Sequence, residues 1–124
     1  MSPIYRDVVM VEDDDTFARV VSRNLTSRGV LVRRAANAAE ACAQIRERRP
    51  DLLLLDINLP DRTGWDVLRE CRDTGPLPTI VLSATALSRE RLAEFKPVAF
   101  LPKPFPLDVL LRLVVGEPAE VAAS

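Results

Sequence analysis

Three carboxylates and one ammonium group are the side chains of this sequence best suited to chemistry. Glu12 and Asp13 follow one short apolar run, Asp56 follows another, and Lys103 follows a third. Three negative charges in one crevice repel one another, so such a cluster is costly unless a cation enters it. Mg²⁺ fits because it takes carboxylate, carbonyl and water oxygens. The pattern therefore predicts a magnesium site, with a lysine that supplies a further positive charge.

The element that positions Asp56 is the segment 51–60. Its four consecutive leucines, Leu52 to Leu55, are typical of a short strand buried on both faces in the middle of a parallel sheet. Asp56 then stands at the carboxyl end of that strand, where open α/β sheets bind their ligands. A lone Asp after a strand is more often a turn or helix-cap residue, so the other site residues must decide its role.

Along the whole chain, short apolar runs alternate with segments whose apolar residues recur at helical spacing. We expect strands at 8–11, 30–34, 52–57, 79–82 and 98–101, and helices over 17–29, 37–49, 64–73, 88–95 and 106–116. Five such alternations predict a three-layer α/β/α, (βα)5 flavodoxin-like fold with right-handed crossovers. If the second and third strands flank the first, the parallel sheet has the order 2-1-3-4-5, with 30–34 at an edge.

Composition indicates a single soluble domain. The 124 residues are 48% hydrophobic and 28% charged with a net charge of -1, which argues against disorder and against strong attraction to nucleic acid or membrane. We expect a domain over 1–116 and a tail or linker over 117–124. No apolar run is long enough to span a bilayer and 1–7 lacks the features of a signal peptide, so we expect a cytoplasmic protein.

The sequence contains no histidine, which excludes histidine metal sites, Ser/His and Cys/His nucleophiles, and a role as the phosphate-donating histidine of a relay. Cys42 and Cys71 are isolated, without the spacing of a metal or redox pair. We expect both to be free thiols in the core.

These residues resemble, over nearly the whole chain, the receiver domain of bacterial two-component response regulators. The marks occur in family order and near family spacing: Glu12-Asp13, the loop 56–60, Ser83-Ala84, Phe100 and Lys103-Pro104-Phe105. The resemblance implies that a histidine kinase or histidine phosphotransfer protein donates a phosphoryl group and that a downstream protein target binds the altered face. The resemblance also implies that the domain catalyses only its own phosphorylation and dephosphorylation. It implies no direct binding of nucleic acid.

Each site residue then has an expected role. Asp56 is the phosphoacceptor and, with Asp13, a direct ligand of Mg²⁺, for which Mn²⁺ is a possible substitute. The backbone carbonyl of Asn58 is the third protein ligand, and Glu12 binds through water. Lys103 and the Ser83 hydroxyl are expected to contact phosphoryl oxygens.

Lys103 stands in a sequence that otherwise favours arginine: Lys96 and Lys103 are the only lysines among 17 Lys and Arg residues. A compact point charge suits a single oxygen better than a planar guanidinium does. Taken alone, a lysine whose ammonium group reaches into solvent would be the more ordinary interpretation. The resemblance implies a cis Lys103-Pro104 bond, which would turn the ammonium group back toward Asp56.

Two aromatic residues have a structural and a functional interpretation. Phe100 is either a core residue or, as the resemblance implies, a switch that turns inward when Ser83 moves toward the phosphoryl group, shifting the face of the fourth helix, fifth strand and fifth helix. Trp65 is expected to be a partly exposed aromatic at a helix start.

The segment 96–99 replaces an acidic run that is usual in the family with Lys, Pro, Val and Ala. It lacks the charges that dimerising regulators use in ion pairs across their interface. We therefore expect a monomer or weak dimer, either stand-alone or part of a longer protein.

Two other classes of protein stay open. An apolar strand ending in Asp56, Ile57 and Asn58 is similar to the start of haloacid-dehalogenase phosphatases, although Asn58 replaces their acid/base Asp and the chain has no room for a cap domain. The other class is a receiver-like binding module that signals without phosphorylation.

Overall fold

The computed structural model describes residues 3–71 and 75–116. Its strands are β1 Asp7–Val11, β2 Leu31–Ala35, β3 Leu52–Asp56, β4 Thr79–Ser83 and β5 Ala99–Pro102. Its helices are α1 Asp15–Thr26, α2 Ala38–Glu47, α3 Gly64–Cys71, α4 Arg89–Phe95 and α5 Leu107–Val115. All strand pairs are parallel, and the sheet order is β2-β1-β3-β4-β5. The predicted fold class and strand order are confirmed.

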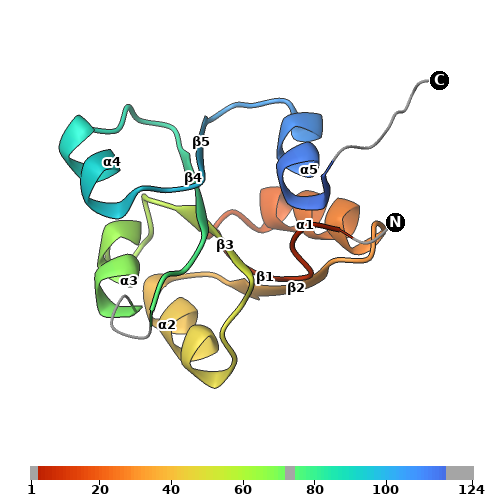
Figure 1. Cartoon of the computed structure of the whole chain (residues 1–124), viewed down its shortest axis with the longest axis horizontal. Helices are drawn as coiled ribbons and strands as arrows, with labels where there is room; N and C mark the ends of the chain where they lie inside the picture. The colour runs from red at the N-terminus through yellow and green to blue at the C-terminus, as the bar shows by residue number, and fades with distance from the viewer. Residues whose placement is uncertain (1–2, 72–74, 117–124) are drawn as a thin grey trace.

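Helices cover both faces of the sheet, as Figure 1 shows, with α1 and α5 on one side and α2, α3 and α4 on the other. Alternate residues of β3 point to opposite faces, as in any strand. Leu53 and Leu55 belong to the core against α2 and α3, whereas Leu52 and Leu54 belong to the core against α1 and α5. The leucine run is therefore buried on both faces, as its composition predicted.

The termini of the helices follow local signals. Asn37 caps α2 by accepting a hydrogen bond from the Glu40 amide, and Ser88 caps α4 in the same way.

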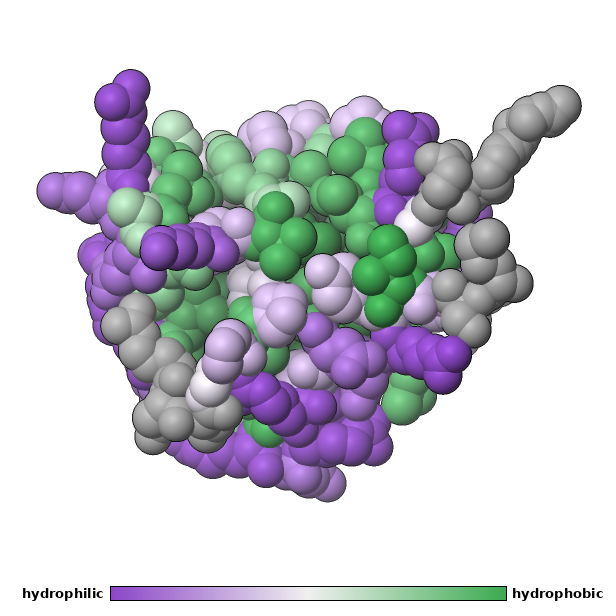
Figure 2. All heavy atoms as spheres, in the orientation of Figure 1, coloured by the Kyte–Doolittle hydropathy of each residue, from purple (hydrophilic) through white to green (hydrophobic). Residues whose placement is uncertain are grey.

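The molecular surface carries both apolar and hydrophilic regions. Figure 2 shows apolar residues through the middle of this view and hydrophilic ones over its lower part, where α2 lies in Figure 1.

Some local expectations were wrong. Trp65 is not partly exposed: only 6% of its surface is accessible, because its ring stacks on Phe95 of α4 with centroids 5.1 Å apart. Val98 precedes β5 and is exposed rather than part of the strand, while β5 extends to Pro102. The expected tail over 117–124 lies outside the described residues.

The Lys103-Pro104 peptide bond is cis, as the resemblance implied. Cys42 and Cys71 are buried and form no disulfide, as expected. Among the described residues, no helix has the length and apolar character needed to cross a membrane.

Candidate functional site

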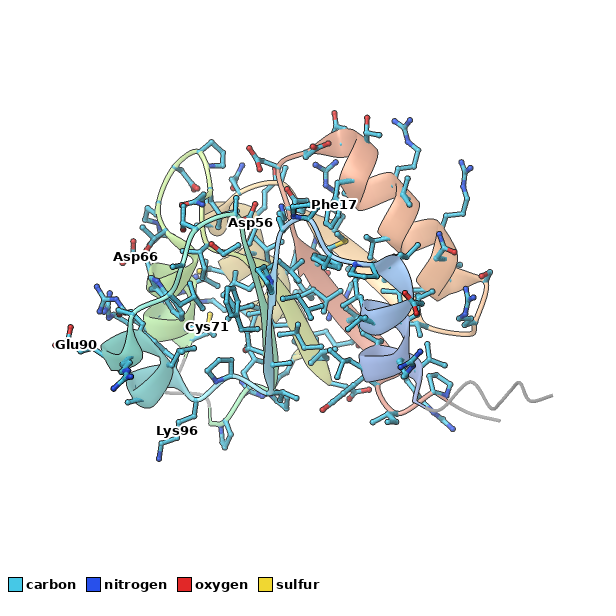
Figure 3. The ribbon with its side chains drawn as sticks, turned by 90° about the horizontal axis from the view of Figure 1, so that it is seen from above. Phe17, Asp56, Asp66, Cys71, Glu90 and Lys96 are labelled. Carbon is cyan, nitrogen blue, oxygen red and sulfur yellow. The ribbon has the colours of Figure 1, made fainter. Side chains whose placement is uncertain are left out.

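The predicted acidic cluster forms where β1 and β3 end. These strands are neighbours in register, Val11 opposite Leu55, so the residues that follow them share one edge of the sheet. Side-chain oxygens of Glu12, Asp13 and Asp56 lie within 4.8 Å of one another. Figure 3 places Asp56 at this edge, with Lys96 at the opposite end of the molecule. Carboxylates at this separation fit the ligand preference of Mg²⁺.

Lys103 reaches into this cluster from the end of β5. Its Nζ lies 2.7 Å from Glu12 Oε1 and 3.3 Å from Asp56 Oδ2, so it is not a surface lysine pointing into solvent. The ammonium also lies 4.7 Å from the centre of the Phe17 ring, which itself meets Phe105 edge to face. Burial acts to lower the pKa of Lys103, but its hydrogen bonds and attraction to the two carboxylates outweigh burial and raise it.

Glu12 is the most enclosed acid of the site, with 1% of its surface accessible. Its Oε2 accepts a hydrogen bond from the Asp14 amide, while both Nε and Nη2 of Arg34 donate to its backbone carbonyl. Burial raises the pKa of Glu12, and the charge of Asp56 adds to that rise, against the opposing effects of Lys103 and the Asp14 amide. A cation near Glu12 would reduce the electrostatic cost of keeping this buried carboxylate ionised.

The loop after β3 approaches its own strand closely. Asp56 Oδ1 accepts a hydrogen bond from the Asn58 amide, and the Gly64 amide donates to the Ile57 carbonyl. A Cβ on Gly64 would stand 2.6 Å from the Asp56 carbonyl oxygen, so only glycine fits there without a backbone shift. The packing thereby brings the first turn of α3 directly against the strand that carries Asp56.

Ser83 ends β4 beside this edge and is fully buried. Its hydroxyl oxygen accepts a hydrogen bond from the Thr85 amide and lies 3.1 Å from the Thr85 hydroxyl, while the Ser83 carbonyl accepts from the Lys103 amide. Phe100 is partly buried against the core on the α2 and α3 side. The structure thus brings Glu12, Asp13, Asp56 and Lys103 together and links Ser83 to Lys103 through the backbone.

Four residues near the site were not singled out from the sequence. Thr85 and Arg34 act through hydrogen bonds to Ser83 and Glu12, and Asp61 binds two amides at the start of α2. Phe17 was assigned to a helix but not to Lys103. No local sequence pattern identifies the partners of Arg34, Asp61 and Phe17, because each of these contacts joins segments that are distant in sequence. Thr85 differs, since it follows Ser83 by only two residues.

A parallel sheet of order β2-β1-β3-β4-β5, with acids after β1 and β3 and a lysine after β5, defines the flavodoxin-like class of which CheY-like receivers are members. The family model of the response regulator receiver domain matches residues 8–115. The chain therefore belongs to the response regulator receiver family, and the expected resemblance is confirmed.

The chain is similar to response regulator MprA of Mycobacterium ulcerans, with 38% identity over 107 residues that cover 84% of this chain and 46% of the relative. It is also similar to the probable transcriptional regulatory protein TcrX of Mycobacterium tuberculosis, with 36% identity over 86% of this chain and 47% of the relative. The chain thus spans about half the length of the curated relatives it matches.

Two solved structures show the same fold. A CheY-like receiver domain protein from Methanospirillum hungatei has a TM-score of 0.80 and 28% identity, covering 87% of this chain and 89% of that one. The response regulator TrrA from Thermotoga maritima, solved in complex with Mg(2+)-BeF, has a TM-score of 0.76 and 25% identity. The match covers 87% of this chain and 95% of that one.

Proposed function

We propose that this receiver domain accepts a phosphoryl group on Asp56 in a magnesium-dependent reaction. The observation that carries the proposal is the position of Lys103, whose Nζ lies 3.3 Å from Asp56 Oδ2 on a cluster of three carboxylates. A nucleophilic carboxylate needs its charge and that of the incoming phosphoryl group neutralised, and phosphoryl transfer depends mainly on such positioning. As one Asp56 oxygen bonds to phosphorus, the bond from phosphorus to the donor breaks, which is P–N for a phosphohistidine and P–O for acetyl phosphate.

Asp13 and Asp56 would hold the ion directly, with the Asn58 carbonyl, and Glu12 would bind through water. When bound, Mg²⁺ supplies positive charge to the phosphoryl oxygens, and Mn²⁺ could replace it. The donor set fits because three carboxylate oxygens converge within 4.8 Å. The complex of TrrA with Mg(2+)-BeF supports this assignment by similarity.

Ser83 and Phe100 would transmit the effect of phosphorylation at Asp56 to the surface of the domain. The Ser83 hydroxyl is paired with the amide and hydroxyl of Thr85 in this structure, so its donation to a phosphoryl oxygen would rearrange that pairing. We infer that Ser83 then moves toward Asp56, that Phe100 turns inward, and that the face of α4, β5 and α5 changes for a protein target.

The phosphoryl donor would be a histidine kinase or a histidine phosphotransfer protein, and the readout would be protein contact in the cytoplasm, without direct binding of nucleic acid or membrane. Residues 1–116 would form the receiver unit, as a monomer or weak dimer. The domain would catalyse only its own phosphorylation and dephosphorylation.

Intact mass after incubation with Mg²⁺ and acetyl phosphate tests the function. We expect one alkali-labile adduct in the wild type, none in Asp56→Asn, and a normal adduct in the control Asp108→Asn, whose carboxylate lies on α5 and pairs with Arg112. An adduct retained by Asp56→Asn would refute the assignment. Sustained phosphate release without a detectable adduct would indicate a hydrolase, and a wild type that neither carries the adduct nor releases phosphate would indicate a binding module.

A further inference from the structure

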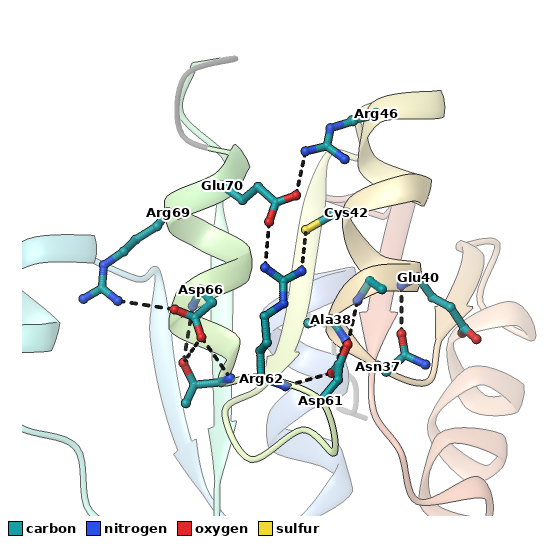
Figure 4. Close-up of polar contacts among 12 residues, drawn as sticks. Asn37, Ala38, Glu40, Cys42, Arg46, Asp61, Arg62, Asp66, Arg69 and Glu70 are labelled. Atoms are coloured by element: carbon teal, nitrogen blue, oxygen red, sulfur yellow. Dashed lines mark hydrogen bonds and ion pairs between the residues drawn. The ribbon is translucent and has the colours of Figure 1, made fainter.

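The loop that follows Asp56 is fastened to the start of α2 by the carboxylate of Asp61. Asp61 Oδ1 accepts a hydrogen bond from the Ala38 amide at 2.9 Å, and Oδ2 accepts one from the Ala39 amide at 3.0 Å (Figure 4). Carboxylate hydrogen bonds to backbone amides at a helix start are strengthened by charge and by the helix dipole. Hydrogen bonds to these amides lower the pKa of Asp61, which favours its ionised carboxylate.

These bonds are additional to the cap that α2 already possesses. Asn37 Oδ1 accepts from the Glu40 amide at 2.9 Å, which is the usual bond of an N-cap residue. The amides of the first turn of α2 have no partner within the helix, and they bond to two acceptors instead. One acceptor is Asn37 at the start of the helix, and the other is Asp61 in the loop after β3. Only the second acceptor connects α2 to the site.

The chain from Asn58 to Asp61 is short and restrained. Leu59 packs against the core on the α2 and α3 side, and Pro60 has a fixed φ. Directly after Asp61, Arg62 donates to Glu70 of α3 at 2.8 Å and to Cys42 of α2, as Figure 4 shows. A shift of Asp61 would therefore displace Asn58, because little slack separates them.

We propose that Asp61 is a positioning residue for the cation site, holding the loop so that the Asn58 carbonyl stands ready beside Asp56. Asp61 lies outside the cluster of three carboxylates and would act on the ion only through the loop. This inference rests on the proposed magnesium site and adds a residue to it. In the absence of the Asp61 bonds, the loop would have to be ordered at the moment of binding, which lowers affinity.

The chain offers a matched control, because Asn37→Ala and Asp61→Ala each remove hydrogen bonds from the first turn of α2, and only the second frees the loop. We expect Asp61→Ala to weaken Mg²⁺ affinity, measured by calorimetry, about tenfold, which is the scale of outer partners of metal sites. Asn37→Ala should bind Mg²⁺ like the wild type. Asp61→Asn, which keeps one carbonyl acceptor, should recover part of the affinity and covers the case in which the alanine variant does not fold.

A second measurement does not depend on the ion. Without Mg²⁺, amide hydrogen exchange at Asn58 and Gly64 should become faster in Asp61→Ala and stay unchanged in Asn37→Ala. Equal exchange and equal Mg²⁺ affinity in Asp61→Ala and the wild type would overturn the positioning role. If instead the wild type binds no Mg²⁺, the proposed site itself fails, and this inference fails with it whatever the exchange shows.

Discussion

Lys103 lies closer to Glu12 than to the proposed acceptor: Nζ is 2.7 Å from Glu12 Oε1 and 3.3 Å from Asp56 Oδ2. Glu12 is almost fully buried, so this ammonium compensates a carboxylate that has little contact with bulk solvent. Removing one partner of a buried ion pair leaves an uncompensated charge, and that costs more than the pair itself contributes.

Lys103→Met should therefore lower the free energy of unfolding by about 2–4 kcal/mol in the absence of divalent cations. Saturating Mg²⁺ should restore part of this loss, since a cation in the cluster takes over the compensation. Urea unfolding with and without Mg²⁺ measures both effects. The control is Lys96→Met at the exposed second lysine, and equal effects of the two substitutions would contradict the role of Lys103.

Magnesium should stabilise the folded chain through the acidic cluster. A ligand at 100 times its dissociation constant adds about 2.7 kcal/mol to the unfolding free energy. In Asp13→Ala this increment should vanish, while the metal-free protein should be no less stable, because one repelling carboxylate is gone. Thermal unfolding in EDTA, Mg²⁺ and Mn²⁺ tests the prediction. An unchanged Mg²⁺ increment in Asp13→Ala would count against Asp13 as a ligand.

Much of the site was predictable because its signals are local. The three acids and Lys103 each follow an apolar run, so they lie at strand ends however the helices pack. The connection rules for parallel strands bring those ends to one edge of the sheet. The burial of Leu52 to Leu55 followed from their composition alone. The order of the strands was partly inferred from the family resemblance, since composition does not choose the side on which a strand is added.

The sequence did not predict contacts that join distant segments. Trp65 at a helix start is ordinarily half exposed, and its burial depends on Phe95, thirty positions later, folding back across it. Asp61 follows Pro60 and looks like a turn residue, although its oxygens bind amides of α2. Such partners are set by tertiary packing, which a periodic pattern does not encode.

Phe95 should hold α4 to the rest of the molecule. None of the seven residues of α4 is buried, while the Phe95 ring stacks on Trp65 at 16° and lies 5.4 Å from the Arg69 guanidinium. Phe95→Ala should reduce stability by about 1–3 kcal/mol, shift Trp65 emission to the red, and speed amide exchange across α4. Phe105→Ala, which removes a ring from the other face, should leave the emission unchanged. A red shift in the control alone would refute this.

The two buried thiols should react slowly. Cys42 is 2% and Cys71 3% exposed, and burial, with smaller effects of Cys71 and Glu70, raises the pKa of Cys42 to about 12. At pH 8 roughly one Cys42 in ten thousand is then a thiolate, the form that attacks thiol reagents. Ellman's reagent should modify neither cysteine quickly in the native protein and both at once in denaturant. Rapid reaction of the folded chain would contradict the core assignment.

Acid should weaken the link between α2 and α3 at Glu70. Its carboxylate accepts hydrogen bonds from Arg62 at 2.8 Å and from Arg46 at 2.6 Å, and these bonds lower its pKa from 4.5 to about 2 (Figure 4). Because the folded-state pKa is depressed, the unfolded chain binds more protons between these values. The stability that Glu70 contributes is therefore complete above about pH 5 and is lost as the pH falls toward 2.

Glu70→Gln should consequently be less stable than the wild type at pH 7, and the difference in urea midpoint should shrink steadily between pH 5 and pH 2. High salt should narrow the difference at pH 7, since both partners are near the surface and their attraction is screened. Glu47→Gln on the exposed side of α2 is the matched control and should show little difference at any pH. A Glu70→Gln deficit that stays constant down to pH 2 would mean that packing of the side chain, and not its charge, joins the two helices.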